Sequence, residues 1–154
     1  MRKSKKVLIL RFSSYGDVAI MIPVLRALSK AYPLDEFVVA SRPKMGPIFH
    51  EFKNIYFQPL DIDNEFKGFT GIFRLFKRLR NLNPTHIADL HYVIRTRIIG
   101  FLFRVLGYKV RRIDKGRKQK NALTRIKNKL FEPLTPTVFR LSLIHISEPT
   151  RRPK

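Results

Sequence analysis

The sequence predicts one α/β domain in which helices cover both faces of a parallel β-sheet. Short apolar runs alternate along the chain with longer segments whose apolar residues recur at helical spacing. The first run, residues 6–12, is almost continuously apolar, as expected of a strand that is buried on both faces. The 154 residues, 44% of them hydrophobic, suffice for one core, and no internal repeat divides them.

Each element follows from its local pattern. The expected strands are residues 6–12, 36–40, 54–57, 85–91 and 108–114; the expected helices are residues 18–32, 69–81 and 94–106, with shorter helices around residues 48–52 and 121–130. Pro33 ends the first helix, and Pro23 either begins its regular part or kinks it. Gly107 terminates the helix before the last strand. The first two strands and their helix form a βαβ unit with a right-handed crossover.

The chain is strongly basic. Its formal charge of +21 predicts an anionic partner such as phosphates, an acidic glycolipid, nucleic acid or a membrane surface, although a solvated basic face explains the charge equally well. The absence of cysteine excludes disulfides and thiolate metal sites. No segment stays apolar for the roughly 20 residues that a membrane span requires, so a soluble or peripheral protein is expected.

No metal site is expected. Asp61, Asp63 and Glu65 are interpreted as a solvated loop, because no Gly and Glu follow at the spacing of a calcium loop. His50 and His86 have no partner at a useful spacing. His91 is interpreted as a satisfied buried histidine rather than as a catalytic one.

The end of the chain has the sequence of a translated DNA adapter. Residues 141–151, LSLIHISEPTR, match the translation of a transposase adapter that is used to prepare sequencing libraries. We therefore expect that residues 1–140 form the domain and that residues 141–154 are a non-native tail. The tail holds three basic residues and one acid, so the basic character belongs to the rest of the chain.

The turn between the first strand and the first helix is the strongest candidate site. Its sequence is RFSSYGDV, residues 11–18. In an open α/β sheet, ligands bind past the carboxyl ends of the strands, so Ser13, Ser14, Gly16 and Asp17 are expected at a functional edge. Asp17 also fits the N-cap of the following helix, and the two serines suit ordinary turn chemistry.

Basic residues recur at later positions. Arg95 and Arg97 lie in the first turn of the 94–106 helix, where a positive charge is unfavourable. Such placement indicates either anion binding or simple exposure. Residues 109–129 contain ten basic residues and one acid, the densest charge in the chain.

Several motifs together carry a resemblance to a known family. They are RFSSYGDV at 11–18 with PVLRAL at 23–28, Tyr32-Pro33, Arg42-Pro43, Asp89-Leu-His91 with Arg95-Thr-Arg97, and DKGR at 114–117 with ALTR at 122–125. This set resembles the amino-terminal half of glycosyltransferase family 9, the ADP-heptose:lipopolysaccharide heptosyltransferases. The resemblance spans residues 6–140.

The resemblance implies the amino-terminal half of a B-type glycosyltransferase, which has two Rossmann-like domains; the second, donor-binding domain is absent from this chain. The implied reaction is inverting transfer of a sugar, heptose from ADP-heptose, to a lipopolysaccharide inner-core acceptor, with this chain alone inactive. The implied catalytic base is Asp17. The implied acceptor-binding residues are Ser13, Ser14, Gly16, Arg42, Arg95, Arg97, Lys115 and Arg117.

The resemblance also sets expectations for partners and location. It implies no cofactor and no metal beyond the nucleotide-sugar donor, which the absent domain would bind. The implied partners are an anionic glycolipid acceptor and the membrane surface, and no nucleic acid is expected. The expected location is cytoplasmic, peripheral at the inner face of the cytoplasmic membrane.

Two other functions remain open at this point. A nucleic-acid-binding domain would explain the charge, but the chain has no zinc finger, helix-turn-helix or RNP motif. A nucleotide-binding Rossmann enzyme would explain the first turn. However, Gly16 stands alone where Gly-x-Gly-x-x-Gly is expected, and no Walker loop is present.

Overall fold

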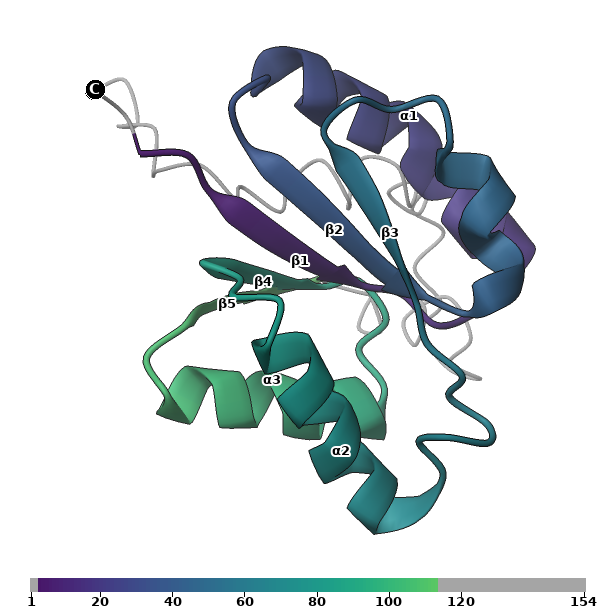
Figure 1. The fold of residues 1–154 in the computed structure, drawn as a ribbon, viewed down its shortest axis with the longest axis vertical. Helices are drawn as coiled ribbons and strands as arrows, with labels where there is room; N and C mark the ends of the chain where they lie inside the picture. The colour runs from purple at the N-terminus through teal and green to yellow at the C-terminus, as the bar shows by residue number, and fades with distance from the viewer. Residues whose placement is uncertain (1–2, 114–154) are drawn as a thin grey trace, which may run out of the picture.

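The computed structural model describes residues 3–113, which form a five-stranded parallel sheet with helices on both faces (Figure 1). The elements are β1 Lys6–Leu10, α1 Tyr15–Ala31, β2 Glu36–Ser41, the 3₁₀ helix η1 Pro43–Phe49, β3 Ile55–Pro59, α2 Gly68–Arg80, β4 His86–Asp89, α3 Ile94–Val105 and β5 Lys109–Arg112. The predicted α/β fold class is confirmed. The expected helix at 121–130, Lys115, Arg117 and the tail at 141–154 lie outside the described residues.

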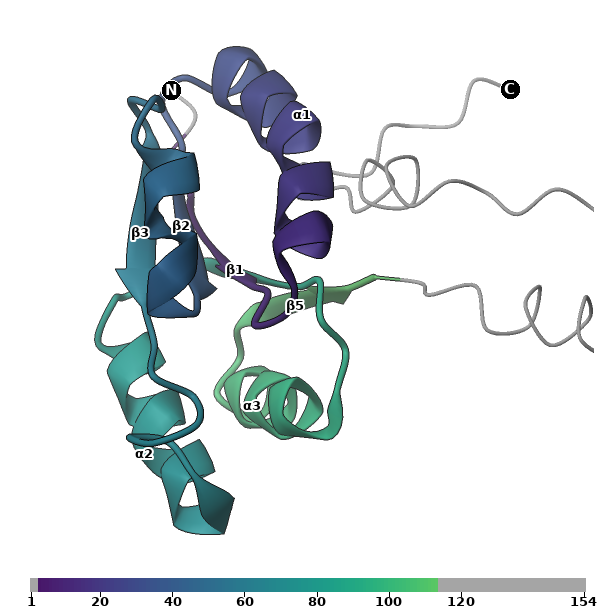
Figure 2. The ribbon, with the colours of Figure 1, turned by 90° about the vertical axis from the view of Figure 1, so that its right-hand side faces the viewer.

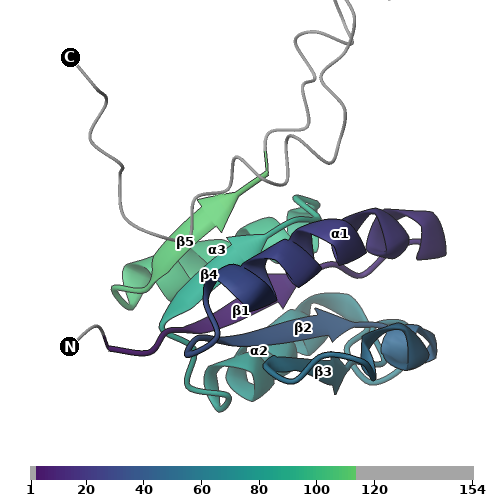
Figure 3. The ribbon, with the colours of Figure 1, turned by 90° about the horizontal axis from the view of Figure 1, so that it is seen from above.

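The strand order places the ends of β1 and β4 side by side. The sheet runs β3-β2-β1-β4-β5, and Figure 3 shows the five strands in this sequence. The chain moves outward from β1 to β3 and then returns to β4 on the other side of β1. Leu10 pairs with Asp89 in the ladder between them. Because this reversal is the switch point at which open α/β sheets bind ligands, the turns after β1 and β4 form the candidate site.

Two apolar cores hold the helices on the sheet. Successive side chains of β1 alternate between them: Val7 and Ile9 face the core under α1, and Leu8 and Leu10 face the core under α2 and α3. Figure 2 shows β1 running between α1 and α3. The two layers are therefore fixed from opposite sides, and the loops at the carboxyl edge start from a rigid base.

Several boundaries differ from the expected ones by one or two residues; β1, for example, ends at Leu10 rather than at residue 12. Three differences have a local physical reason. First, α1 begins at Tyr15, three residues before the predicted start, because the Val18 N–H donates to the Ser14 carbonyl and closes an earlier turn (3.1 Å). Pro23 lies inside α1 and does not begin it. Second, β4 ends at Asp89, since the next two residues leave the ladder and form a turn.

The third difference is the short helix expected around residues 48–52, and this prediction was wrong. The structure has a 3₁₀ helix at Pro43–Phe49 instead. Pro43 has the fixed φ that suits a first helical position, and the missing N–H of Pro47 removes one α-helical hydrogen bond. Within residues 3–113, none of the helices is both long enough and apolar enough to cross a membrane.

Candidate active site at the carboxyl ends of β1 and β4

Asp17 is paired with the buried arginine that leaves β1. The Nη2 group of Arg11 lies 2.8 Å from the Asp17 Oδ2 atom, and the Nη1 group of Arg11 donates to the Leu90 carbonyl after β4. Arg11 is buried, whereas the Asp17 side chain is 39% exposed. Within residues 3–113, the other carboxylate oxygen of Asp17 has no hydrogen-bond partner. Arg11 therefore fixes the orientation of Asp17 and leaves one oxygen open toward solvent.

The N-cap interpretation of Asp17 was wrong. The N-cap of α1 is Ser14, and Asp17 is the third residue of the helix. A carboxylate in this first turn is favoured by the partial positive charge of the helix N-terminus. Asp17 therefore stabilises the start of α1 by its charge, while only one of its carboxylate oxygens is bonded, to Arg11.

Side chains that follow the two neighbouring strands, β2 and β4, hold the backbone before this turn. The N–H of Phe12 donates to the Nδ1 atom of His91 (3.2 Å), and the Phe12 carbonyl accepts from the Nε group of Arg42 (2.7 Å). The Nε2 atom of His91 lies 3.0 Å from the Ser13 Oγ atom. Residues 11–13 are thus bonded on the β2 side and on the β4 side, so the turn is preorganised.

The structure brings Ser13, Ser14, Gly16 and Asp17 together at the N-terminus of α1. Ser13 is half-buried, whereas Ser14 and Gly16 are exposed. The Ser14 hydroxyl makes no capping hydrogen bond. A Cβ atom built on Gly16 meets nothing within 4 Å, so the fold does not require glycine there. The first N–H groups of any α-helix lack helical partners, so this turn presents several donors beside the Asp17 carboxylate.

The three arginines predicted at this edge are partly used inside the chain. Arg42 bonds the Phe12 carbonyl and forms a two-pronged ion pair with Asp63. Arg95 donates to the Ile62 carbonyl (3.0 Å). The Arg97 guanidinium stacks 5.6 Å from the centre of the Tyr92 ring. The guanidinium of Arg42 is therefore occupied in holding the turn to the loop after β3. The exposed guanidinium of Arg97 keeps its N–H groups available for an anion.

Asp89 holds the turn that follows β4. Its Oδ1 atom accepts the N–H groups of His91 (3.0 Å) and Tyr92 (2.7 Å), and the residue is fully buried. These bonds support the left-handed backbone of Tyr92, whose φ is 49°. Burial raises the pKa of the Asp89 carboxyl, although its hydrogen bond with the Tyr92 N–H acts in the opposite direction. The position of His91 thus depends on a buried carboxylate.

We expect this buried charge to produce a pH-dependent difference in stability from the Asp89→Asn variant. Below the ordinary value of 3.8, the carboxyl is protonated in both the folded and the unfolded chain. As the pH rises above 3.8, the unfolded chain loses this proton before the folded chain does, so the folded state loses free energy relative to it. The difference in free energy of unfolding between the wild type and Asp89→Asn should therefore move against the wild type as the pH rises. Urea unfolding of both proteins from pH 4 to pH 7 measures this difference, and an advantage that grows with pH would contradict it.

Each acidic side chain of the loop after β3 has a partner of its own. Asp63 pairs with Arg42, and Glu65 pairs with Arg78 (3.3 Å). Asp61 accepts hydrogen bonds from the side chain and backbone of Asn64, and these bonds lower the pKa of its carboxyl. In the part of the chain that the structure describes, no three His, Cys, Asp or Glu side chains gather in a way that could hold a metal ion.

Sequence reasoning missed two residues of this site. Arg11 was treated as part of a motif, but it links the turn after β1 to the turn after β4. His91 was interpreted as a buried structural histidine, but it is half-buried and bonds both Phe12 and Ser13. The sequence signal that could have indicated both residues is their position, since Arg11 and His91 each follow a buried strand. Recognising the contacts also required the knowledge that β1 and β4 are neighbours.

Several solved structures share this fold. A glycosyl transferase family 9 structure from Veillonella parvula aligns with 94% of this chain and 42% of its own, with a TM-score of 0.63 and 18% identity. The Escherichia coli heptosyltransferase WaaC with ADP aligns with 90% of this chain and 46% of its own, with a TM-score of 0.59 and 19% identity. WaaC with ADP-2-deoxy-2-fluoro heptose gives the same coverages and TM-score at 18% identity.

These structural similarities support the fold, whereas the sequence identities of 18% and 19% are low. No family model matches the sequence, and no curated protein matches it. The chain spans less than half the length of the solved structures that it resembles. The chain thus has the Rossmann-like fold that occurs within glycosyltransferases, including members of the family that its motifs resemble.

Proposed function

We propose that this chain is the acceptor-side half of an inverting glycosyltransferase of family 9, which transfers a sugar from a nucleotide donor to an acceptor hydroxyl. The observation that carries the proposal is the Arg11–Asp17 pair at the switch point of the sheet, which leaves one Asp17 oxygen open. The fold and the motif around Asp17 support the same reaction. On this proposal a second domain, beyond the residues described, holds the donor.

The chemistry requires one base on the acceptor side. As the acceptor oxygen forms its bond to the anomeric carbon, the bond from that carbon to the donor phosphate breaks, and the nucleoside diphosphate leaves with the electron pair. The open oxygen of Asp17 accepts the proton of the acceptor hydroxyl. Arg11 keeps the carboxylate aligned and compensates its negative charge before the proton arrives.

The acceptor that fits this edge is anionic. The guanidinium of Arg97 is exposed and makes no hydrogen bond within residues 3–113, while that of Arg95 has one bond to a carbonyl, so both side chains have donors to spare. Guanidinium groups bind carboxylates and phosphates by paired hydrogen bonds. These spare donors suit an anionic acceptor. From the resemblance of the motifs to family 9, we propose the lipopolysaccharide inner core as the acceptor and ADP-heptose as the donor, with Lys115 and Arg117 as further acceptor contacts.

A transferase assay tests this proposal. A protein in which residues 1–140 continue into a donor-binding domain should transfer heptose from ADP-heptose to an inner-core precursor, as detected by mass spectrometry, whereas residues 1–140 alone should give no turnover. Turnover by the short chain, or none by the long one with any nucleotide sugar, would contradict the proposal. Binding of DNA as tight as binding of the precursor would favour the nucleic-acid alternative, and binding of a dinucleotide would favour a nucleotide-binding enzyme.

Gly16 provides a test of acceptor approach. We expect Gly16→Ala to leave folding intact, or to stabilise α1 by up to about 1 kcal/mol, because alanine is the better helix former and the new Cβ meets no protein atom. The same Cβ would occupy space beside the acceptor and weaken precursor binding by about tenfold or more. Thermal unfolding and calorimetric titration measure the two effects. Unchanged affinity would place the acceptor away from Gly16.

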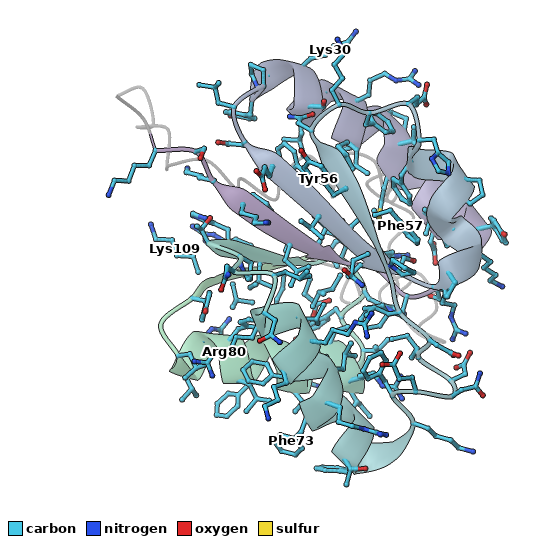
Figure 4. All side chains as sticks on the ribbon, viewed as in Figure 1. Lys30, Tyr56, Phe57, Phe73, Arg80 and Lys109 are labelled. Carbon is cyan, nitrogen blue, oxygen red and sulfur yellow. The ribbon has the colours of Figure 1, made fainter. Side chains whose placement is uncertain are left out.

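We also propose that the protein is cytoplasmic and binds the inner face of the cytoplasmic membrane through the outer face of α2. Phe69 and Phe73 are 71% and 52% exposed there, and Figure 4 shows Phe73 pointing away from the sheet. Arg74 and Lys77 are exposed on the same helix. Exposed aromatic groups beside cations on one helix face favour an anionic lipid surface.

Vesicles test the membrane proposal. Phe73→Ser should weaken binding to phosphatidylglycerol–phosphatidylethanolamine vesicles by about tenfold, since it removes one aromatic group from the interface. Tyr56→Ser is the matched control, because Tyr56 is 51% exposed on the edge strand β3. Equal losses in the two variants would contradict a role for α2.

A further inference from the structure

His91 connects the turn after β4 to the hydroxyl group nearest the start of the proposed acceptor site. Its Nδ1 atom lies 3.2 Å from the Phe12 nitrogen, and its Nε2 atom lies 3.0 Å from the Ser13 Oγ atom. The ring also meets the Phe12 ring edge-on, with centroids 5.7 Å apart. Three contacts with two successive residues therefore fix the plane of the imidazole.

The hydrogen bonds determine which ring nitrogen carries the proton. A backbone N–H can only donate, so the Nδ1 atom that faces Phe12 must accept with a free lone pair. A neutral imidazole then carries its hydrogen on Nε2. The Nε2–H group consequently donates to the Ser13 Oγ atom.

This arrangement determines what Ser13 can offer a ligand. One lone pair of its oxygen is occupied by His91, and the hydrogen of its own hydroxyl cannot point back along that bond. The hydroxyl hydrogen must turn elsewhere, and Ser13 is only half-buried. The Ser13 hydroxyl hydrogen is thus directed away from His91 and is available to a ligand beside the α1 N-terminus, while the second lone pair of the oxygen can still accept.

The backbone that carries His91 is itself fixed at three successive residues. The Leu90 carbonyl accepts from Arg11, and the N–H groups of His91 and Tyr92 donate to the buried Asp89 carboxylate. Arg11 also holds Asp17. His91, which orients the Ser13 hydroxyl, and Arg11, which orients Asp17, are therefore both held by the short turn after β4.

We propose that His91 is a positioning residue that makes Ser13 the donor for an acceptor-sugar oxygen that has no hydrogen of its own, such as a ring ether, carboxylate or phosphate oxygen. The identity of the ligand as the acceptor sugar rests on the proposed function. Asp17 then accepts from the reacting hydroxyl while Ser13 donates to this second oxygen.

The protonation state is tested on the 154-residue chain without any ligand. Nitrogen-15 chemical shifts of the His91 ring at neutral pH should show the neutral form with hydrogen on Nε2. Ser13→Ala should speed the exchange of that hydrogen with solvent, because its acceptor is lost. A hydrogen on Nδ1, or a doubly protonated ring, would overturn the inference whatever the chain binds.

Two substitutions of His91 separate positioning from simple support of the fold. His91→Asn places an amide oxygen near the Nδ1 position, so it keeps the bond from the Phe12 N–H and loses the donor to Ser13. His91→Gln places an amide nitrogen near the Nε2 position, so it keeps the donor and loses the bond to Phe12. A purely structural role predicts that the two variants weaken binding only as far as they weaken folding.

The binding experiment uses a deacylated inner-core lipopolysaccharide precursor as its probe and calorimetry as its readout. Ser13→Ala and His91→Asn should each lower affinity about five- to tenfold, the double variant should be no weaker than either, and His91→Gln should recover most of the affinity. Additive losses, or a His91→Gln variant as weak as His91→Asn, would overturn the inference. If the wild-type chain does not bind the precursor, the proposed function fails, while the nitrogen-15 measurement still decides the state of His91.

Discussion

Asp17→Asn is expected to lower the turnover of heptose transfer about 1,000-fold in a protein that carries this chain together with a donor-binding domain. The amide has nearly the shape of the carboxylate and can still accept from Arg11, but it cannot take the proton of the acceptor hydroxyl. Loss of a general base typically costs 100- to 10,000-fold. Because the acceptor is still bound, its KM should change far less than kcat. Steady-state kinetics with varied acceptor concentration measure both.

Two controls make this result specific. Asp61→Asn removes an acid from the exposed loop after β3, where its partner is Asn64, and should leave turnover unchanged. Asp17→Asn also leaves the buried Arg11 without its counter-charge, so rates should be normalised to the folded fraction measured by circular dichroism. A variant that is folded and retains more than about a tenth of the turnover would exclude Asp17 as the base.

Gly71→Ala is expected to destabilise the domain by about 3 kcal/mol, corresponding to a fall in Tm of roughly 10 °C. A Cβ atom at Gly71 would lie 2.3 Å from the carbonyl carbon and oxygen of Phe66. The neighbour is backbone, so it cannot turn aside as a side chain would. Relief would require α2 to move away from the preceding loop, which would loosen the packing of Ile72 and Leu75. Differential scanning calorimetry measures the change.

Gly16→Ala is the matched control for this stability effect. Both glycines lie in the first turn of a helix, but the Cβ of Gly16 would meet nothing within 4 Å. The Tm of Gly16→Ala should therefore stay the same or rise. Similar losses in the two variants would show that the close approach at Gly71 is not the cause.

The elements could be predicted because each is determined by its own neighbours in the sequence. Continuous apolar residues indicated β1, and the helical spacing of Ile72, Phe76 and Leu79 indicated α2, whose observed bounds differ from the prediction by one residue at each end. The start of α1 was predicted too late because apolar periodicity begins at Val18, while the first helical hydrogen bond is made by backbone at Ser14. Backbone capping leaves little trace in a hydrophobic pattern.

The site could be predicted only in part, for a related reason. The position of Asp17 after a buried strand placed it at the functional edge. The contacts that orient it join residues 79 positions apart, Arg11 with Leu90 and Phe12 with His91. They follow from the pairing of β1 with β4, and strand order is a property of the whole sheet rather than of any local segment. The pairing of Arg42 with Asp63 was missed for the same reason, since the two residues follow different strands.

Mapping the acceptor on the 154-residue chain by NMR tests the central claim most directly. In a titration with the deacylated inner-core precursor, the account predicts saturable shifts in the backbone amides of residues 13–17, 91 and 97, with smaller shifts elsewhere among residues 3–113. The same chain titrated with a DNA duplex or with a dinucleotide should show no saturable shifts at residues 13–17. Shifts that leave residues 13–17 unchanged while the precursor binds, or stronger shifts there with the dinucleotide, would contradict an acceptor site built around Asp17.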